Sequence, residues 1–189
     1  MENRKLRSAI IGCGNIFPMH AVPVSKNPYT QLTAVCDIKP ERAQSAAHRF
    51  SCRGYTDYKR MLDEERPDVV HICTPHYLHA PLACYAMQQG CHVLTEKPMA
   101  IKLKDARRML DTAESTGKTL GVIFQNRYNA GSQLIRQCLD SGELGQVQAG
   151  RLLLTWNRSS EYYSQSDWKG TWEKEGGGVV IDQAIHTLD

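Results

Sequence analysis

The sequence lacks any concentration of charge of one sign. Its 189 residues include 23 Lys and Arg and 20 Asp and Glu, which gives a formal net charge of +3. No run of Lys or Arg forms the basic stripe that nucleic-acid-binding proteins present to phosphates. We therefore expect no nucleic-acid partner.

Long hydrophobic runs are absent as well. The early apolar run is interrupted by Gly12 and Gly14, and no charged-then-apolar segment typical of a secretion signal begins the sequence. These absences predict a cytoplasmic protein without a membrane partner. The composition, 41% hydrophobic and 23% charged, is that of an ordinary globular protein.

The seven cysteines show no pairing pattern. Their number is odd, and no two of them are spaced as Cys-x-x-Cys. Both facts argue against a disulfide framework and against a zinc site. Cys36, Cys73 and Cys91 stand in apolar stretches, where we interpret them as small buried hydrophobic residues.

Short runs of Val, Ile and Leu alternate with longer amphipathic segments in the first two thirds of the chain. This alternation predicts an α/β fold with helices around a parallel sheet. We expect strands at 8–11, 32–36, 69–73, 92–94 and 119–123. The helices are expected at 16–26, 40–50, 57–65, 78–89 and 103–116.

The pattern changes near Gln125, where we place a domain boundary. Residues 125–189 are predicted to begin an α+β domain, with a helix at 131–140, a strand at 147–156 and an irregular loop at 157–175. An apolar stretch follows the three glycines at 176–178 and is expected to be helical. So few elements provide little sheet to cover their apolar faces, and we therefore expect this second domain to be incomplete.

A glycine-rich turn follows the first predicted strand. In Gly12-Cys13-Gly14-Asn15-Ile16 the glycines permit a tight turn, and the next helix would begin where a pyrophosphate could bind its N-terminus. The third glycine of the usual motif is replaced by Phe17. The turn therefore predicts, for residues 1–124, a dinucleotide-binding domain of the Rossmann type.

Asp37 closes the second predicted strand about 20 residues further on, where a carboxylate can accept hydrogen bonds from the ribose of NAD. The same carboxylate would repel the 2′-phosphate of NADP. Lys39 and Arg42 lie close enough in sequence to keep NADP open as the cofactor. A solvent-exposed acid at a strand end is the alternative interpretation of Asp37.

Further motifs resemble one enzyme family. Thr74-Pro75 with His79, Glu96-Lys97-Pro98, and the run from Gly176-Gly177-Gly178 to Asp182 and His186 stand in the order found in the glucose-fructose oxidoreductase, inositol dehydrogenase and rhizopine catabolism family. The resemblance covers nearly the whole chain. It implies a doubly wound sheet, a second domain that often forms the oligomer interface, and a homo-oligomer when the protein is full length.

The resemblance also implies roles for individual residues. Lys97 would stabilise charge on the substrate oxygen, His186 would act as general acid/base, and Asp182 would orient the substrate or the imidazole. Without the resemblance, Lys97 reads as a surface partner of Glu96 and His186 as a packed residue. The other residues expected at the cofactor are Thr74, Pro75, His79, Glu96, Arg127, Trp168 and Lys169.

Some features depart from the family or leave alternatives open. His76 stands where Asn is common, and Lys169 stands where many relatives have Arg. His79 could instead cap its helix. Asp182, His186 and Asp189 could be imagined as metal ligands, but the resemblance implies no metal.

The leading hypothesis is an NAD(P)-dependent dehydrogenase that oxidises a hydroxyl of a sugar, cyclitol or sugar derivative. Two alternatives remain at this point. One is NAD-dependent glycoside hydrolysis, in which the cofactor is reduced and reoxidised within one turnover. The other is a nucleotide-binding sensor or regulator without catalytic activity.

Overall fold

Residues 6–122 build a sheet in which every strand runs parallel to its neighbours. The structure is a computed structural model, and it describes residues 4–189. The strands are β1 (Leu6–Ile11), β2 (Thr30–Cys36), β3 (Arg53–Tyr55), β4 (Val69–Ile72), β5 (His92–Thr95) and β6 (Leu120–Val122). Their order, β3-β2-β1-β4-β5-β6, confirms the predicted doubly wound α/β sheet.

Helices cover both faces of the sheet. They are α1 (Phe17–Lys26), α2 (Pro40–Phe50), α3 (Tyr58–Glu65), α4 (His79–Gln88) and α5 (Leu103–Thr116), with a short 3-10 turn η1 (His76–Leu78) before α4. Ile10 packs with Phe17 of α1 on one face, while Ile72 packs with Met87 and Met109 on the other. The continuous apolar strands of the sequence are explained by this two-sided burial.

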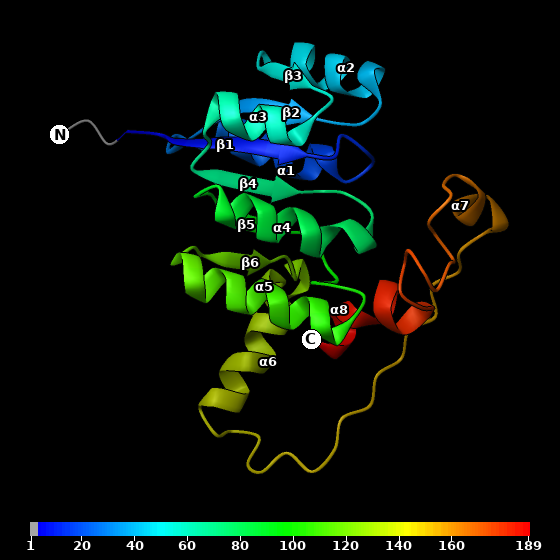
Figure 1. Ribbon diagram of the computed structural model, residues 1–189. Coiled ribbons are helices and arrows are strands. Elements are labelled where there is room, and N and C mark those ends of the chain that lie inside the picture. The colour runs from blue at the N-terminus through cyan, green and yellow to red at the C-terminus, as the bar shows by residue number, and fades with distance from the viewer. Residues whose placement is uncertain (1–3) are drawn as a thin grey trace.

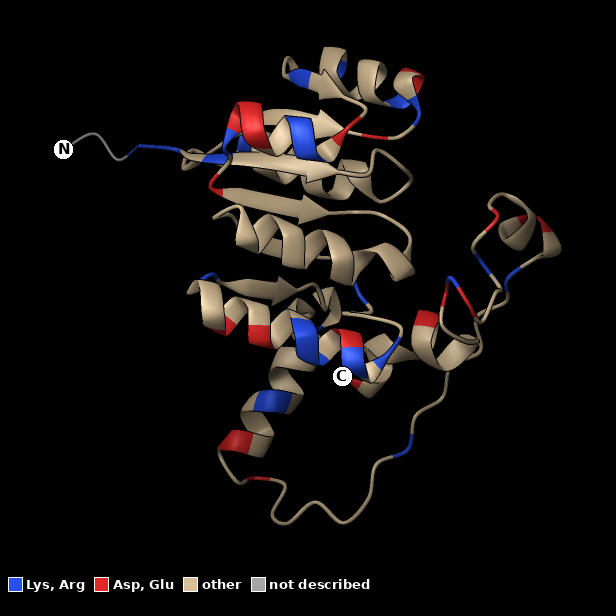
Figure 2. Ribbon diagram, in the orientation of Figure 1, with Lys and Arg blue, Asp and Glu red and all other residues tan. Residues whose placement is uncertain are grey.

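α4 is the helix least suited to water. It carries no charged residue and lies between the charged helices α3 and α5 (Figure 2), and seven of its residues are buried. The α3 and α5 helices instead expose Lys, Arg, Asp and Glu on their outer faces. The sequence therefore places its least polar helix at the centre of its layer.

The remaining residues form a looser second part. It contains a 3-10 turn η2 (Gln125–Tyr128), helix α6 (Ala130–Asp140), the short α7 (Ser160–Ser164), a π-helical turn η3 (Val180–Ala184) and α8 (Ile185–Leu188). Figure 1 shows the sheet as a stack whose arrows point toward α7 and α8, while α6 hangs from the end of β6. The C-terminal turns thus lie at the carboxyl ends of the strands.

One predicted strand is wrong, and one strand of the sheet was not predicted. Residues 147–156, expected as a strand, are irregular and mostly exposed, because no other strand of residues 4–189 lies beside them to complete a hydrogen-bonded ladder. Strand β3 was not predicted, since its three residues contain no apolar run. The predicted helices are confirmed to within two residues at each end, apart from the separate turn η1.

The ends of β1 and β4 meet at Gly12. The backbone of Gly12 has φ +99°, and a Cβ there would lie 2.5 Å from the carbonyl oxygen of Cys73. Its N–H donates to the carbonyl of Cys36, 2.8 Å away. Only glycine permits both the left-handed backbone and this close approach.

We predict that Gly12→Ala lowers the free energy of unfolding by about 3 kcal/mol or more, because it adds a backbone clash to an unfavourable φ. Gly90 is the matched control, since its φ is +90° but nothing lies within 4 Å of a Cβ. Gly90→Ala should cost only about 1 kcal/mol. Urea unfolding of both variants measures the difference, and equal losses would show that the contact with Cys73 is unimportant.

Candidate active site

The glycine-rich turn presents free backbone donors at the start of α1. A Cβ on Gly14 would meet nothing within 4 Å, so the space beside this residue is open. Within residues 4–189 the N–H groups of Gly14, Asn15 and Ile16 have no hydrogen-bond acceptor, and no side chain caps α1. Free N–H groups at a helix N-terminus favour a phosphate.

Asp37 is buried directly after β2 and holds this turn in place. Its Oδ2 accepts a hydrogen bond from the N–H of Cys13 at 2.8 Å, and its Oδ1 accepts one from the N–H of Lys39 at 2.9 Å. Burial at 8% exposure rules out the interpretation of Asp37 as a solvent-exposed acid. Each carboxylate oxygen keeps a second lone pair, so a ribose hydroxyl can still bind.

The loop after β4 is fixed by a fully buried histidine. In His79, Nδ1 lies 2.7 Å from the carbonyl oxygen of Pro98 and Nε2 lies 2.9 Å from that of Thr74. Burial lowers the pKa of this imidazole. His79 therefore lies between the loops that follow β4 and β5, and it does not cap its helix.

Glu96 ends a chain of buried polar groups that the sequence did not reveal. Its Oε1 lies 2.9 Å from Nε2 of His20, whose Nδ1 lies 3.1 Å from Nδ1 of His71. Burial lowers the pKa of His71 to about 4, so that ring is neutral. The carboxylate of Glu96 is thereby held against α1, next to Lys97.

Lys97 and Asp182 are brought together from positions 85 residues apart. Nζ of Lys97 donates to the main-chain carbonyl of Asp182 and lies 3.4 Å from its Oδ1. The side chains are only 15% and 12% exposed. Lys97 is therefore a partly buried residue of the cleft and not a surface partner of Glu96.

His186 lies one turn after Asp182, in α8. Burial and the ammonium of Lys97 lower the pKa of this imidazole, so the ring is neutral near pH 7. Its Nδ1 is buried without a hydrogen bond. The hydroxyl of Tyr162, which the sequence analysis did not single out, donates to Oδ2 of Asp182 at 3.3 Å.

Buried polar atoms without partners gather at this cleft. Within residues 4–189 there are four such side-chain atoms: Thr74 Oγ1, Glu175 Oε1, Gln183 Oε1 and His186 Nδ1. All four belong to segments at the carboxyl ends of the strands or to the C-terminal turns beside them. Since buried polar groups are normally hydrogen-bonded, these atoms indicate a site for polar ligand groups.

Three further residues expected at the cofactor make different contacts within the protein. Arg127 is 64% exposed and pairs with Asp189. The ring of Trp168 packs against His76, with centroids 4.8 Å apart, and Nζ of Lys169 lies 3.6 Å from the ring centre of Tyr162. The roles of Arg127, Trp168 and Lys169 toward a cofactor stay predictions.

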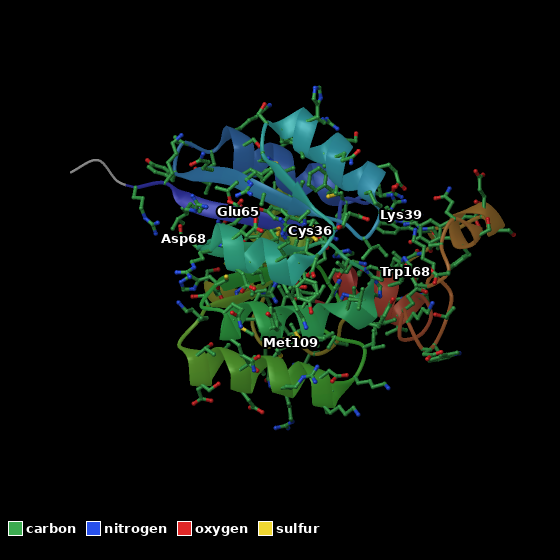
Figure 3. The ribbon with its side chains drawn as sticks, turned by 45° about the horizontal axis from the view of Figure 1, so that its top comes forward. Cys36, Lys39, Glu65, Asp68, Met109 and Trp168 are labelled. Carbon is green, nitrogen blue, oxygen red and sulfur yellow. The ribbon has the colours of Figure 1, made fainter. Side chains whose placement is uncertain are left out.

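Two surface hollows lie at opposite ends of the strands. One of about 570 Å³ lies at the amino ends of the strands and is lined by Leu6 and Asp68. The other, of about 280 Å³, is lined by Glu175, Asp182 and Gln183. Figure 3 shows Trp168 and Lys39 at one side of the molecule and Asp68 at the other. Ligands of open parallel sheets bind at the carboxyl ends, which favours the smaller hollow.

Residues 4–189 bring together no group of three or more His, Cys, Asp or Glu side chains that could hold a metal ion. The set Asp182, His186 and Asp189 is therefore not a metal centre in this arrangement. Among the same residues, no helix is both long enough and apolar enough to cross a membrane.

A parallel sheet in the order 3-2-1-4-5-6, a glycine turn between β1 and α1, and a buried acid after β2 define a dinucleotide-binding protein of the Rossmann class. Residues 6–124 match the family model described as "Oxidoreductase family, NAD-binding Rossmann fold", and residues 132–189 match the C-terminal domain of the same family. The chain belongs to the Gfo/Idh/MocA family of oxidoreductases.

Named relatives are similar over much or all of the chain. D-glucoside 3-dehydrogenase of Escherichia coli is 35% identical over 100% of this chain and 54% of its own length. dTDP-3,4-didehydro-2,6-dideoxy-alpha-D-glucose 3-reductase of Streptomyces violaceoruber is 33% identical over 77% of this chain and 43% of its own length. The chain thus spans about half the length of the curated relatives it matches.

A solved structure is similar over the whole chain. The WlbA dehydrogenase from Chromobacterium violaceum, in complex with NADH and UDP-GlcNAcA, superposes with a TM-score of 0.96 at 35% identity. The match covers 100% of this chain and 55% of that one. This likeness includes the irregular residues 147–156 as well as the sheet.

We predict that Gly14→Ala weakens NADH binding about tenfold or more, because the added methyl group enters the open space at the free N–H groups. Thermal stability should stay unchanged, since the methyl group meets no protein atom. Gly131→Ala is the control, because its Cβ also meets nothing within 4 Å but lies in α6. Calorimetric titration with NADH that gives equal affinities for both variants would contradict the assignment of the turn.

Proposed function

We propose that the protein is an NAD(P)-dependent dehydrogenase that oxidises a ring hydroxyl of a sugar, cyclitol or sugar derivative to a ketone. The observation that carries the proposal is the contact of Lys97 with Asp182 beside the neutral imidazole of His186. These groups lie at the carboxyl ends of the strands, on the same side of the sheet as the glycine turn. Family membership supports the redox chemistry.

The residues of the chain suit a cofactor at this edge. The open space at Gly14 fits a pyrophosphate, Asp37 fits a ribose, and the unpaired Thr74 Oγ1 offers a polar contact beside the turn. Bound NAD would supply the hydride acceptor. The carboxylate of Asp37 favours NAD over NADP, although Lys39 is exposed nearby and leaves NADP as a second possibility.

In oxidation, the ammonium of Lys97 donates to the substrate oxygen and stabilises the negative charge that grows on it. His186, whose side chain lies beside Lys97 and Asp182, takes the hydroxyl proton on a ring nitrogen. Asp182 holds Lys97 through its carbonyl and carboxylate, and its Oδ2 accepts from Tyr162. In the reverse direction, His186 returns the proton to the alkoxide.

The names of the relatives narrow the position of attack. D-glucoside 3-dehydrogenase and the dTDP-hexose 3-reductase both act, by their names, at position 3 of a hexose. We propose the same position here, on a glucose-configured ring. No observation favours glycoside hydrolysis or a regulatory role, and assay of NADH formation with methyl glucosides, inositols and UDP-sugars tests the proposal directly.

We also propose a cytoplasmic homo-oligomer in which residues 125–189 belong to a second domain. Support comes from the apolar side chains that stay exposed in this part, among them Leu134, Ile135, Leu153 and Trp156. α6 buries none of its side chains within the chain. Light scattering of the full chain measures the oligomeric state.

We predict that Lys97→Met lowers kcat about 10²- to 10³-fold, because the substrate oxygen loses its charged donor. NADH affinity should be retained, since the glycine turn and Asp37 are untouched. Initial rates and fluorescence titration with NADH measure the two quantities. A variant that keeps wild-type kcat would remove Lys97 from the mechanism.

The pH dependence should report His186. Since its pKa is lowered and only the neutral ring accepts a proton, kcat/KM for oxidation should fall as pH drops through a value below 6.5 and be level above it. Burial is the largest cause of the lowering, and the charged groups acting on the ring are Lys97, Glu96, Asp182 and Asp189. If kcat/KM instead began to fall at a pH above 7, His186 would not be the general base.

A further inference from the structure

His76 is buried beside the cleft, yet the mechanism above does not use it. It lies in η1, directly after Pro75, and is 6% exposed. Its ring packs edge-on against Trp168 and lies 5.7 Å, centre to centre, from the ring of His79. This packing fixes the orientation of the imidazole, so each ring nitrogen has a defined role as hydrogen-bond donor or acceptor.

One ring nitrogen has a fixed partner. Nδ1 of His76 lies 2.9 Å from the main-chain carbonyl oxygen of Glu175. A carbonyl oxygen only accepts, so Nδ1 must carry the hydrogen. This bond, together with the N–H of Tyr77 donating to the carbonyl of Lys174, fastens the C-terminal segment to the loop after β4.

The other ring nitrogen is left as a bare acceptor. Burial is the main cause that lowers the pKa of His76 to about 4, so the ring is neutral and Nε2 carries no hydrogen. Within residues 4–189 Nε2 has no hydrogen-bond partner, and it is not among the four fully buried unpaired atoms. It therefore keeps a small opening to the space outside the protein.

That space adjoins the cleft of Lys97 and Asp182, because Glu175, whose carbonyl oxygen is bonded to Nδ1, lines the same hollow as Asp182. The ammonium of Lys97 is among the groups that lower the pKa of His76, and the carboxylate of Asp182 is among those that raise it, so both charges lie near the ring. The ammonium of Lys97 donates to Asp182 and has no hydrogen bond to Nε2. A ligand hydroxyl that reaches Lys97 would thus have neighbouring hydroxyls within reach of a neutral acceptor.

We infer that His76 selects the substrate: its Nε2 accepts a hydrogen bond from a hydroxyl next to the one that is oxidised, while its Nδ1 fastens the C-terminal segment. This inference rests on the proposed function, because it needs a polyhydroxylated substrate at Lys97. It makes His76 a specificity-determining residue whose two nitrogens have separate tasks.

Two amide variants of the full chain separate the two tasks. In His76→Asn the amide nitrogen can replace Nδ1 as donor to Glu175, but nothing replaces Nε2. In His76→Gln the longer amide reaches the place of Nε2, but the donor to Glu175 is lost. Each variant thus keeps one half of the imidazole.

We expect His76→Asn to raise KM for the sugar about tenfold, the effect of one lost hydrogen bond, with NADH affinity and melting temperature close to wild type. The substrate analogue that lacks the neighbouring hydroxyl should bind both proteins equally. His76→Gln should melt at a lower temperature and show a smaller rise in KM. Steady-state kinetics, NADH titration and thermal unfolding give the three readouts.

The outcomes distinguish this inference from the proposed function. If wild type oxidises a sugar and His76→Asn has an unchanged KM, the substrate contact is overturned while the dehydrogenase assignment stands. If the variant loses NADH affinity instead, His76 contacts the cofactor and the inference is equally overturned. If wild type oxidises none of the sugars, cyclitols or UDP-sugars tested, the proposed function fails first.

Discussion

The close approach of β1 and β4 at Gly12 is the constraint on which the rest of the structure depends. With the Cys73 carbonyl 2.5 Å from where a Cβ would stand, the two strand ends leave no room for a side chain between them. The turn that follows is then free to open toward solvent at Gly14, and Asp37 holds it from the neighbouring strand. The residues proposed to bind the cofactor surround this junction.

The second half of the chain reaches the site through a few polar contacts. Lys97 bonds to Asp182, and His76 bonds to Glu175, so both loops of the sheet hold the C-terminal segment. These contacts bury charged and polar groups that water would otherwise solvate, which makes each of them costly to break singly. The proposed catalytic arrangement and the docking of this segment therefore depend on the same set of interactions.

Much of the fold follows from the sequence because its signals are local. Apolar runs, glycines at helix C-termini and prolines at helix N-termini predicted five of the six strands and the helices α1 to α6. The glycine turn and Asp37 predicted the part of the site that would bind the nucleotide. β3 escaped because three residues carry no periodicity. The expected strand at 147–156 failed because a strand needs a partner, and its sequence says nothing about one.

Fewer residues of the site than of the fold could be predicted from the sequence, because many of them meet only through contacts between distant positions. Motif residues such as Lys97 stand at strand ends, which topology brings to one edge. His20, His71 and Tyr162 act through contacts that only packing creates, and the bond from His76 to Glu175 spans 99 positions. Nothing in the local pattern around these residues distinguishes them from ordinary core or loop residues.

His79 has one consequence beyond its place in the fold. Both of its ring nitrogens face carbonyl oxygens, those of Thr74 and Pro98, and a neutral imidazole has a single hydrogen to share between them. At any moment only one of the two loops is held by this side chain, and the tautomer decides which. A change of tautomer of His79 would therefore transfer the hydrogen bond from one loop to the other. This transfer moves a hydrogen between the two ring nitrogens and requires no change in the backbone.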